Sequence, residues 1–232
     1  MEFIISKEIF EKVPNLQVGV LVLANINNKA DISKFFDDEM GTIAQGMFAY
    51  FDGMELSEYQ LIRTWREIFK SFGEKKVRSS VEALMKRVLN GKGLYRINSL
   101  VDLYNLASLR FELPCGGEDL NMMSAPLELV IAKGDERFLP LGGIETENPN
   151  AGEIIYKSGG LVVCRNFNYR ESDITKLTEN TKNAIIIFED ALGNTEKLNK
   201  ALAWIGEKAK ILLNAETKKS CILNRNSHTL SF

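Results

Sequence analysis

Apolar residues follow two different periods along this chain, and segments with the two periods are interspersed. Short apolar runs rich in β-branched and aromatic residues predict buried strands at residues 3–5, 18–24, 127–132, 153–157, 160–165 and 182–189. Apolar residues at helical spacing predict helices at residues 57–72, 79–90, 99–108 and 195–213. Because strands and helices mix without regular alternation, we expect an α+β fold in which helices pack beside a mixed sheet.

Turn residues predict how several of the strands are connected. Residues 133–136, Lys-Gly-Asp-Glu, have the composition of a hairpin turn. They would join the strand at 127–132 to a returning strand at 137–141. Residues 158–160, Ser-Gly-Gly, predict a second hairpin between the strands at 153–157 and 160–165.

The ends of the predicted domain differ from its middle. Glycines interrupt residues 40–54, which therefore predict a broken helix. Residues 1–213 are expected to form a single domain. Residues 214–232 are polar and rich in Asn, Ser and Lys, and we expect a tail that is partly disordered or added to the edge of a sheet.

Residues 96–120, RINSLVDLYNLASLRFELPCGGEDL, combine a short helix with a glycine pair and several polar residues. Ser99 is the expected N-cap of the helix. A strand-like run at 109–113 then leads to Gly116 and Gly117, where a turn with positive φ would let a ligand approach the backbone. A tight turn without a functional role is the alternative. The polar residues at the edges of this unit are candidate site residues: Asn98, Asp102, Asn105, Glu118 and Asp119.

Basic residues gather in two of the predicted helices. Between residues 75 and 96 the sequence has seven Lys and Arg residues and a single acid. This local excess suits contact with a phosphate backbone, although basic residues equally serve to keep two helices soluble. Arg78, Ser79 and Ser80 precede the second helix, and two hydroxyls and an Arg at a helix N-terminus can hold a carboxylate or a phosphate. Arg66, which lies off the apolar stripe of the preceding helix, is a further candidate for ligand contact.

A third group of polar residues follows the strand predicted at 160–165. Polar and aromatic residues alternate there, as a small polar pocket requires. Arg165 and Arg170 can pair with a carboxylate or a phosphate, and Asn168 can both donate and accept hydrogen bonds. Ordinary alternation in an edge strand is the alternative explanation.

Composition and charge narrow the classes of protein that fit. The chain has 232 residues, 45% of them hydrophobic and 26% charged, with a net charge of −2, so it is an ordinary globular protein rather than a basic nucleic-acid binder. Three cysteines without CxxC spacing and a single histidine, His228, make a structural metal or a disulfide framework unexpected. We predict no cofactor and no membrane segment, and a cytoplasmic location.

The motifs INSLVDLYNLASL and LPCGGEDL, in this order, resemble the editing domain of the phenylalanyl-tRNA synthetase β subunit, the B3/B4 domain. The chain is still more similar to free-standing proteins that consist of this domain alone, and the resemblance runs from about residue 55 to residue 189. Two further patterns of the free-standing proteins are matched, by Trp65-Arg66 and by the spacing of Cys164, Arg165, Asn168 and Arg170.

In the synthetase, this domain hydrolyses tyrosine wrongly attached to phenylalanine tRNA, without a metal, by orienting a water and the ester. The resemblance places the Asn of the family's central helix on Asn105. The neighbouring Thr falls on Tyr104 and a pocket His falls on Gly116, so the chain departs from the synthetase at two positions. In place of that His, the backbone N–H groups of Gly116 and Gly117 could stabilise the developing oxyanion.

The resemblance therefore implies a stand-alone editing-type hydrolase that acts on an aminoacyl-tRNA ester, with tRNA as its partner. In this hypothesis the catalytic residues hold the ester and the water, contact the amino group or accept a proton. They are Asn105, Gly116, Gly117, Glu118 and Asp119. The substrate-binding residues, which would hold the phosphate, the ribose or the aminoacyl group, are Arg66, Arg78, Ser79, Ser80, Asn98, Asp102, Arg165, Asn168 and Arg170.

Two alternatives stay open. The chain could be a non-catalytic module that binds tRNA ends or a small amino acid, or a retained fold that acts as an interaction protein. Nothing resembles an ATP-binding aminoacylation core, so the chain is not expected to charge tRNA. The sequence predicts neither the amino acid nor the oligomeric state.

Overall fold

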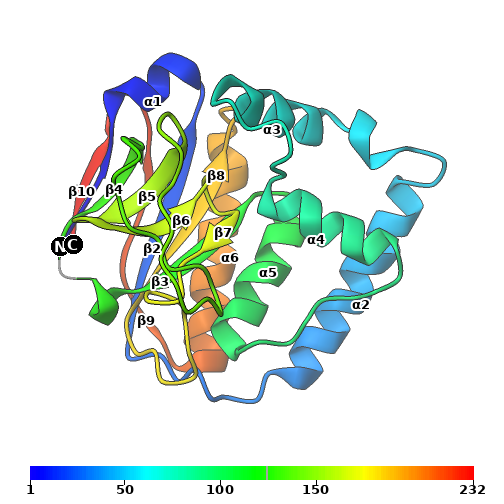
Figure 1. The fold of residues 1–232 in the computed structure, drawn as a ribbon. Helices are drawn as coiled ribbons and strands as arrows, with labels where there is room; N and C mark the ends of the chain where they lie inside the picture. Colours follow the sequence, from blue (N-terminus) through cyan, green and yellow to red (C-terminus); the bar gives the residue numbers. More distant parts are fainter. Residues whose placement is uncertain (124) are drawn as a thin grey trace.

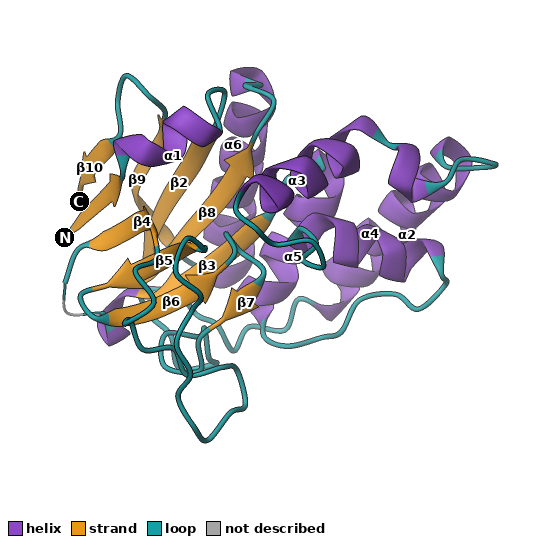
Figure 2. Cartoon of the chain, turned by 45° about the horizontal axis from the view of Figure 1, so that its top comes forward, coloured by secondary structure: helices purple, strands orange, loops and turns teal. Residues whose placement is uncertain are grey.

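Two sheets form the centre of the protein, and most of the helices pack on one side of them (Figures 1 and 2). The computed structural model describes residues 1–123 and 125–232. The larger sheet is mixed and has the strand order β10 (Thr229–Ser231), β1 (Glu2–Ile5), β4 (Leu127–Ile131), β5 (Ile154–Ser158), β6 (Leu161–Arg165) and β7 (Arg170–Glu171). The smaller sheet is antiparallel and has the strand order β3 (Cys115–Asp119), β8 (Ala184–Asp190), β2 (Gln17–Ala24) and β9 (Glu216–Leu223).

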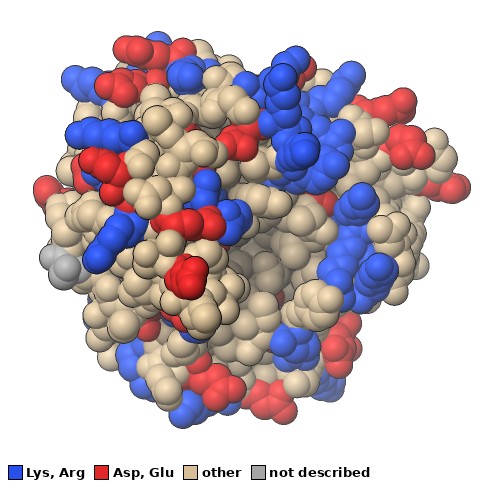
Figure 3. All heavy atoms as spheres, viewed as in Figure 1, with Lys and Arg blue, Asp and Glu red and all other residues tan. Residues whose placement is uncertain are grey.

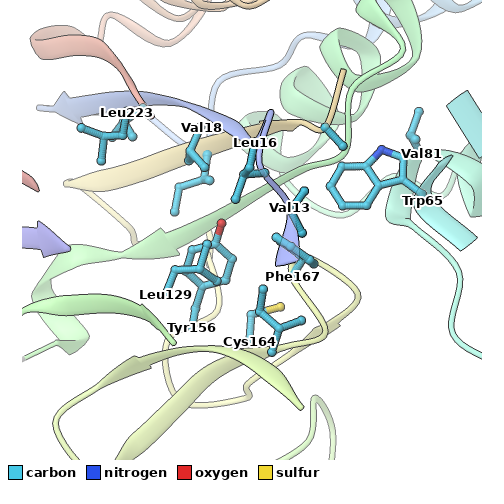
Figure 4. Packing of buried hydrophobic residues seen from close by; sticks show 14 of the residues in the cluster. Val13, Leu16, Val18, Trp65, Val81, Leu129, Tyr156, Cys164, Phe167 and Leu223 are labelled. Carbon is cyan, nitrogen blue, oxygen red and sulfur yellow. The ribbon is translucent and has the colours of Figure 1, made fainter. Parts of the chain in front are cut away.

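The smaller sheet is buried on both faces in its central strands, because alternate residues of a strand point to opposite sides. Val18 and Val20 of β2 pack into the core between the two sheets, together with Leu129 of β4 (Figure 4). Leu21 and Leu23 of the same strand point into a second core on the helical side. The continuous apolar runs in the sequence therefore correspond to strands that are covered on both faces.

The helices form a third layer. Helices α5 (Ser99–Phe111) and α6 (Thr195–Leu213) cover the outer face of the smaller sheet. Helices α2 (Ser33–Tyr50) and α4 (Ser80–Leu89) pack against α5, and α3 (Gln60–Ser71) lies beside α4 (Figure 1). The short helix α1 (Lys7–Lys12) connects β1 to β2. Among the described residues, no helix has both the length and the apolar character needed to cross a bilayer.

The turn between β6 and β7 is anchored in the core beneath α3. Phe167, in the middle of the turn, is buried, and its ring meets those of Trp65 and Phe69 edge to face, with centroids 5.2 and 6.2 Å apart (Figure 4). Asn166 and Phe167 both have left-handed backbone conformations, with φ of 53° and 57°. This conformation costs about 1–2 kcal/mol per residue, and the burial of the Phe167 ring offsets it.

The α+β prediction is confirmed, and several of the predicted elements recur in the structure. The hairpin predicted through residues 158–160 is formed by β5 and β6, and the helix predicted at 195–213 coincides with α6. The segment 214–232 does not extend from the fold. It supplies an edge strand to each sheet, β9 beside β2 and β10 beside β1, which is the second of the two alternatives expected for it.

The hairpin predicted through residues 133–136 was wrong. The chain bends at Gly134, and the Glu136 carboxylate accepts hydrogen bonds from the backbone N–H groups of Lys133 and Gly134. However, β4 pairs with β5 instead of with residues 137–141. Arg137 makes an isolated parallel bridge to Leu161 at the start of β6. Since β6 runs in the same direction as β4, the chain bends at residues 133–136 without reversing. The choice of partner strand depends on contacts distant in the sequence.

Helix boundaries required three further corrections. Helix α2 runs unbroken through the glycines of residues 40–50. Helix α5 continues to Phe111, where a strand-like run was predicted at 109–113, and ends at Glu112, which has a positive φ of 52°. Its N-cap is Asn98 rather than Ser99, because the Asn98 side chain accepts the hydrogen bond from the Val101 N–H at 3.1 Å.

Candidate functional site

A cavity of about 280 Å³ lies where β3, the β6–β7 region and helices α4 and α5 meet. The face of the molecule in Figure 3 is hollowed near its centre, between β7 and these two helices, and basic side chains gather over α3 and α4 along one side of the hollow. The cavity brings together residues from segments that are far apart in the sequence. Those singled out from the sequence are Ser80, Asn105, Gly116, Gly117, Glu118 and Asn168.

The glycine pair lies within strand β3, and neither residue has a positive φ, so the predicted turn was wrong. Close approach explains the glycines instead. A Cβ at Gly116 would overlap the Oδ1 of Asn168, and a Cβ at Gly117 would lie 2.6 Å from Ile186 Cδ1. The absence of side chains lets the β6–β7 turn and strand β8 press against β3.

Strand β3 is at the edge of its sheet, so its backbone groups alternate between β8 and the opposite edge, where Glu118 makes an isolated bridge to Lys176. The N–H of Cys115 donates to Ser80 Oγ at 3.3 Å, and the N–H of Asp119 donates to the Thr175 carbonyl at 2.8 Å. Both donors point away from β8. The same alternation directs the N–H of Gly117 away from β8 and the N–H of Gly116 toward β8. Of the two glycines, Gly117 is thus the one whose N–H points to the edge of β3 where Ser80 and residues 175–176 lie.

Two carboxyl groups line the cavity, the buried Glu118 and the half-buried Glu171. Glu118 is 5% exposed, and among the described residues its Oε2 has no hydrogen-bond partner. Burial, reinforced by the neighbouring Glu171 carboxylate, raises the pKa of Glu118 well above its usual range, against an opposing effect of the Thr175 hydroxyl beside it. Burial also raises the pKa of Glu171 to about 7, against a weaker opposing effect of Lys176. The cavity therefore contains an acid pair that holds at least part of one proton at neutral pH.

A third buried carboxyl group lies behind the cavity and joins the two sheets. Glu189 of β8 accepts a hydrogen bond from the Tyr156 hydroxyl of β5 at 2.8 Å. Burial raises the pKa of Glu189 to about 8, although this hydrogen bond acts in the opposite direction.

The two cysteines that line the cavity are not activated as nucleophiles. Burial raises the pKa of the Cys115 thiol well above its usual range, and the Glu189 carboxylate adds to the effect. Burial raises the pKa of Cys164 in the same direction, as do nearby carboxylates. Both thiols are therefore protonated at neutral pH, whereas a nucleophilic cysteine needs its thiolate form.

Asn105 and Asn168 are the amide side chains of the cavity. Asn105 is half-buried on α5, and no hydrogen bond to its side chain is found among the described residues. The Asn168 side chain lies against the Glu189 carboxylate and lowers the pKa of that group, in opposition to burial. The Asn105 amide is available to a ligand, and the N–H and carbonyl groups of an amide can orient either an ester or a water.

Four other candidates have structural partners and do not line the cavity. Asp119 accepts hydrogen bonds from the Thr181 hydroxyl at 2.6 Å and from a backbone N–H. Asn98 caps α5 and accepts from Asn28 Nδ2 at 3.0 Å. Asp102 accepts from Arg96 Nε at 2.6 Å and from a backbone N–H. These polar groups hold the loops around α5 and β3 in place. Ser79 caps helix α4 by accepting from a backbone N–H at 3.3 Å.

The arginines after β6 are also paired within the protein. Arg165 is 7% exposed and donates to both oxygens of the buried Glu153, at 2.6 and 2.5 Å. Glu147 accepts from Arg170 at 2.7 Å and pairs with Arg165 as well. A buried charge requires a partner of opposite sign, and these carboxylates take the positions that a ligand's phosphate or carboxylate would occupy.

The arginines of α3 and α4 meet at a single buried carboxylate. Glu82, which is 1% exposed, accepts from Arg66 at 2.6 and 3.2 Å and from Arg78 at 3.2 Å. Two cations therefore share one anion, and both remain partly exposed. Arg66 lines a second cavity, of about 570 Å³, between α4 and the connection from α2 to α3. This arrangement keeps a net positive charge beside α4.

Sequence reasoning missed Glu171 as a site residue. It lies next to Arg170, at the end of the segment singled out from the sequence. A single glutamate is not by itself a recognisable sequence motif. Its role in the cavity follows from burial and from its closeness to Glu118, which only the fold reveals. Within the described residues, no group of three or more His, Cys, Asp or Glu side chains could hold a metal ion.

Comparisons with known proteins add a family match. The model of the family described as "B3/4 domain" matches residues 64–200. Among solved structures, an N-terminal fragment of the phenylalanyl-tRNA synthetase beta-subunit from Pyrococcus horikoshii superposes with a TM-score of 0.47 at 13% identity, over 95% of this chain. The chain spans 53% of that fragment's length. No curated protein matches significantly.

Proposed function

Because the chain belongs to the B3/4 domain family, we propose that it recognises the aminoacyl end of a tRNA and hydrolyses the ester as a stand-alone editing-type domain. The observation that carries the proposal is the cavity, where two amide side chains, the glycine pair and an acid pair converge from α5, β3 and the β6–β7 region. A site for ester hydrolysis needs hydrogen-bond donors for the carbonyl oxygen and groups that orient a water.

In this proposal, the donors for the ester carbonyl are the Asn105 amide and the N–H of Gly117. Both line the cavity, and donors fixed in place before the reaction stabilise the negative charge that develops on the carbonyl oxygen. The Asn168 amide, held by the anchored β6–β7 turn, lines the cavity and would orient the attacking water. Since both thiols are protonated, the reaction proceeds by attack of water rather than through a covalent enzyme intermediate.

The tRNA would contact the basic surface beside the hollow in Figure 3. Lys75, Lys76 and Lys86 are exposed, and the ion pairs of the described residues do not involve them. Arg66 and Arg78 add the charge that Glu82 leaves uncompensated. Contacts of this kind to phosphates are independent of nucleotide sequence and weaken as salt rises.

The test is deacylation of a panel of aminoacylated tRNAs by the wild type and by Asn105→Ala. We expect the wild type to hydrolyse at least one species, and the variant to lose about 10²–10³-fold in rate with unchanged affinity for tRNA. The matched control is Asn15→Ala, which removes an exposed amide that does not line the cavity. A fully active Asn105→Ala variant would refute the assignment of this residue.

A non-catalytic function is the second candidate. The protonated thiols and the glycine at position 116, where the synthetase has a pocket His, favour a module that binds the aminoacyl end without cleaving it. In that case the panel would show binding of aminoacyl-tRNA in preference to uncharged tRNA, with no hydrolysis of any species.

A further inference from the structure

Among the described residues, the acid pair in the cavity forms no salt bridge with a Lys or an Arg. Glu118 and Glu171 both line the cavity, and none of its lining residues is a Lys or an Arg. The salt bridges found among the described residues include neither carboxyl group. An ionised carboxylate out of water needs either a proton or a ligand of opposite charge.

The surroundings of the pair offer it little positive charge. Lys176, which follows β7, is the base that lowers the pKa of Glu171, and it is already bonded to Asp173 at 2.7 Å. The other titratable groups that face the pair are neutral: Tyr104 on α5, Tyr156 on β5 and Cys164 on β6. Cys115 of β3 lines the same cavity, and Glu189 of β8 lies behind it. The walls of the cavity therefore favour a positively charged ligand group.

We propose that Glu118 and Glu171 form a subsite for a primary ammonium group, so that the cavity accepts ligands with a free amine and rejects N-acylated ones. The buried, unpartnered Oε2 of Glu118 is the acceptor that such a group would satisfy. A carboxylate binds an ammonium through charge-assisted hydrogen bonds, which are stronger than neutral ones. The amide nitrogen of an acylated amine carries no charge and leaves the pair unsatisfied.

This inference deepens the proposed function, on which it rests for the identity of the ligand. The ammonium group is the α-amine of the aminoacyl ester, held while Asn105 and Gly117 contact the carbonyl. The substrate class is then an aminoacyl group with an unmodified amine, and formylated or peptidyl groups are excluded. A cavity of about 280 Å³ has room for one amino acid rather than for a peptide.

Binding is coupled to the release of a proton. The pair is partly protonated near neutral pH because burial raises the pKa of Glu171 to about 7 and also raises the pKa of Glu118. An ammonium group stabilises the ionised form of both carboxyls, so ligand binding displaces protons into the solvent. Affinity for a protonated amine therefore rises with pH from 5 to 7.

The experiment uses a panel of L-amino acid amides and their N-acetyl forms, titrated by calorimetry into the full chain. For the tightest amide, we expect N-acetylation to weaken binding at least about tenfold, the effect of losing one charge-assisted hydrogen bond. Titrations in two buffers of different ionisation enthalpy should show proton release at pH 6.5. Glu118→Gln and Glu171→Gln should each weaken amide binding by a similar factor and reduce the proton release.

Gln has the size of a protonated Glu, so both variants should fold, which their thermal unfolding checks. Glu11→Gln, at an exposed position of α1, is the control for the change in net charge. Equal affinity for an amide and its N-acetyl form, amide binding that survives both substitutions, or no amide binding at all would each overturn the subsite. If aminoacyl-tRNA is hydrolysed in the absence of amide binding, the subsite fails and the proposed function stands. If binding depends on the amine but no aminoacyl-tRNA is hydrolysed, the subsite stands and the proposed hydrolysis fails.

Discussion

The buried carboxyl of Glu189 makes the stability of the protein fall as pH rises. Its pKa is raised from 4.5 to about 8 by burial, so the folded state keeps a proton that the unfolded state releases above pH 4.5. The contribution of Glu189 to the free energy of unfolding is fully present below pH 4.5 and is lost progressively as pH rises to 8. With about 1.4 kcal/mol for each unit of pKa difference, the penalty reaches about 3 kcal/mol at pH 7 and at most about 5 kcal/mol above pH 8.

Glu189→Gln removes this titration while keeping an oxygen that can accept the hydrogen bond from Tyr156. We expect the variant to lose about 1.4 kcal/mol less stability than the wild type for each pH unit between 5 and 8. The raised pKa values of Glu118 and Glu171 also make stability fall with pH. The quantity to follow is therefore the difference in free energy of unfolding between the wild type and Glu189→Gln. The assay is urea unfolding at pH 5, 6, 7 and 8, followed by tryptophan fluorescence, with the free energy extrapolated to zero denaturant.

The control for this prediction is Glu11→Gln, which makes the same change in charge at an exposed position. Its stability curve should run parallel to that of the wild type. Parallel curves for Glu189→Gln and the wild type would refute the reasoning, as would a wild type whose stability rises between pH 5 and pH 8. Tyr156→Phe provides a second check, since it removes the hydrogen bond and should steepen the decline with pH.

Three other predictions follow from the packing and the charge of the site. Gly116→Ala should displace the Asn168 side chain, cost about 1–3 kcal/mol of stability from overpacking and reduce binding or hydrolysis of aminoacyl-tRNA; unaltered activity would contradict the close approach seen at β3. Phe167→Ala should cost about 3–5 kcal/mol in urea unfolding, less any backbone strain that it relieves, and a cost below 1 kcal/mol would show that the turn is not anchored by its ring. Lys86→Gln should weaken tRNA binding and reduce the slope of log affinity against log salt concentration by about the value of one phosphate contact. An unchanged slope would show that the tRNA binds another surface.

The periodic parts of the fold could be predicted from the sequence. The helix at 195–213 and the strand at 182–189 follow from local patterns, because the spacing of apolar residues indicates their buried faces. The pairing of strands could not be predicted in the same way. β4 and its partner β5 are separated by a loop with good turn chemistry, and that chemistry pointed to the wrong partner.

The site shows the same limit at the level of single residues. A glycine pair is typical of a turn, yet Gly116 is explained by Asn168 and Gly117 by Ile186, both far away in the sequence. Arg165 has the chemistry of an anion-binding residue, but Glu153 neutralises it, and no local pattern shows that pairing. The role of a charged side chain depends on its partners and its burial, which are properties of the fold.

The anchored turn between β6 and β7 also sets how this protein can be redesigned. Asn168 reaches the cavity because the neighbouring Phe167 is held among the aromatic rings beneath α3, so changes at Trp65 or Phe69 would disturb the cavity without touching it. Ligand specificity is better altered at cavity-lining residues that do not anchor the β6–β7 turn. Leu84 and Leu141 line the cavity outside the aromatic cluster, and libraries built at these two positions would explore new ligands on an intact scaffold.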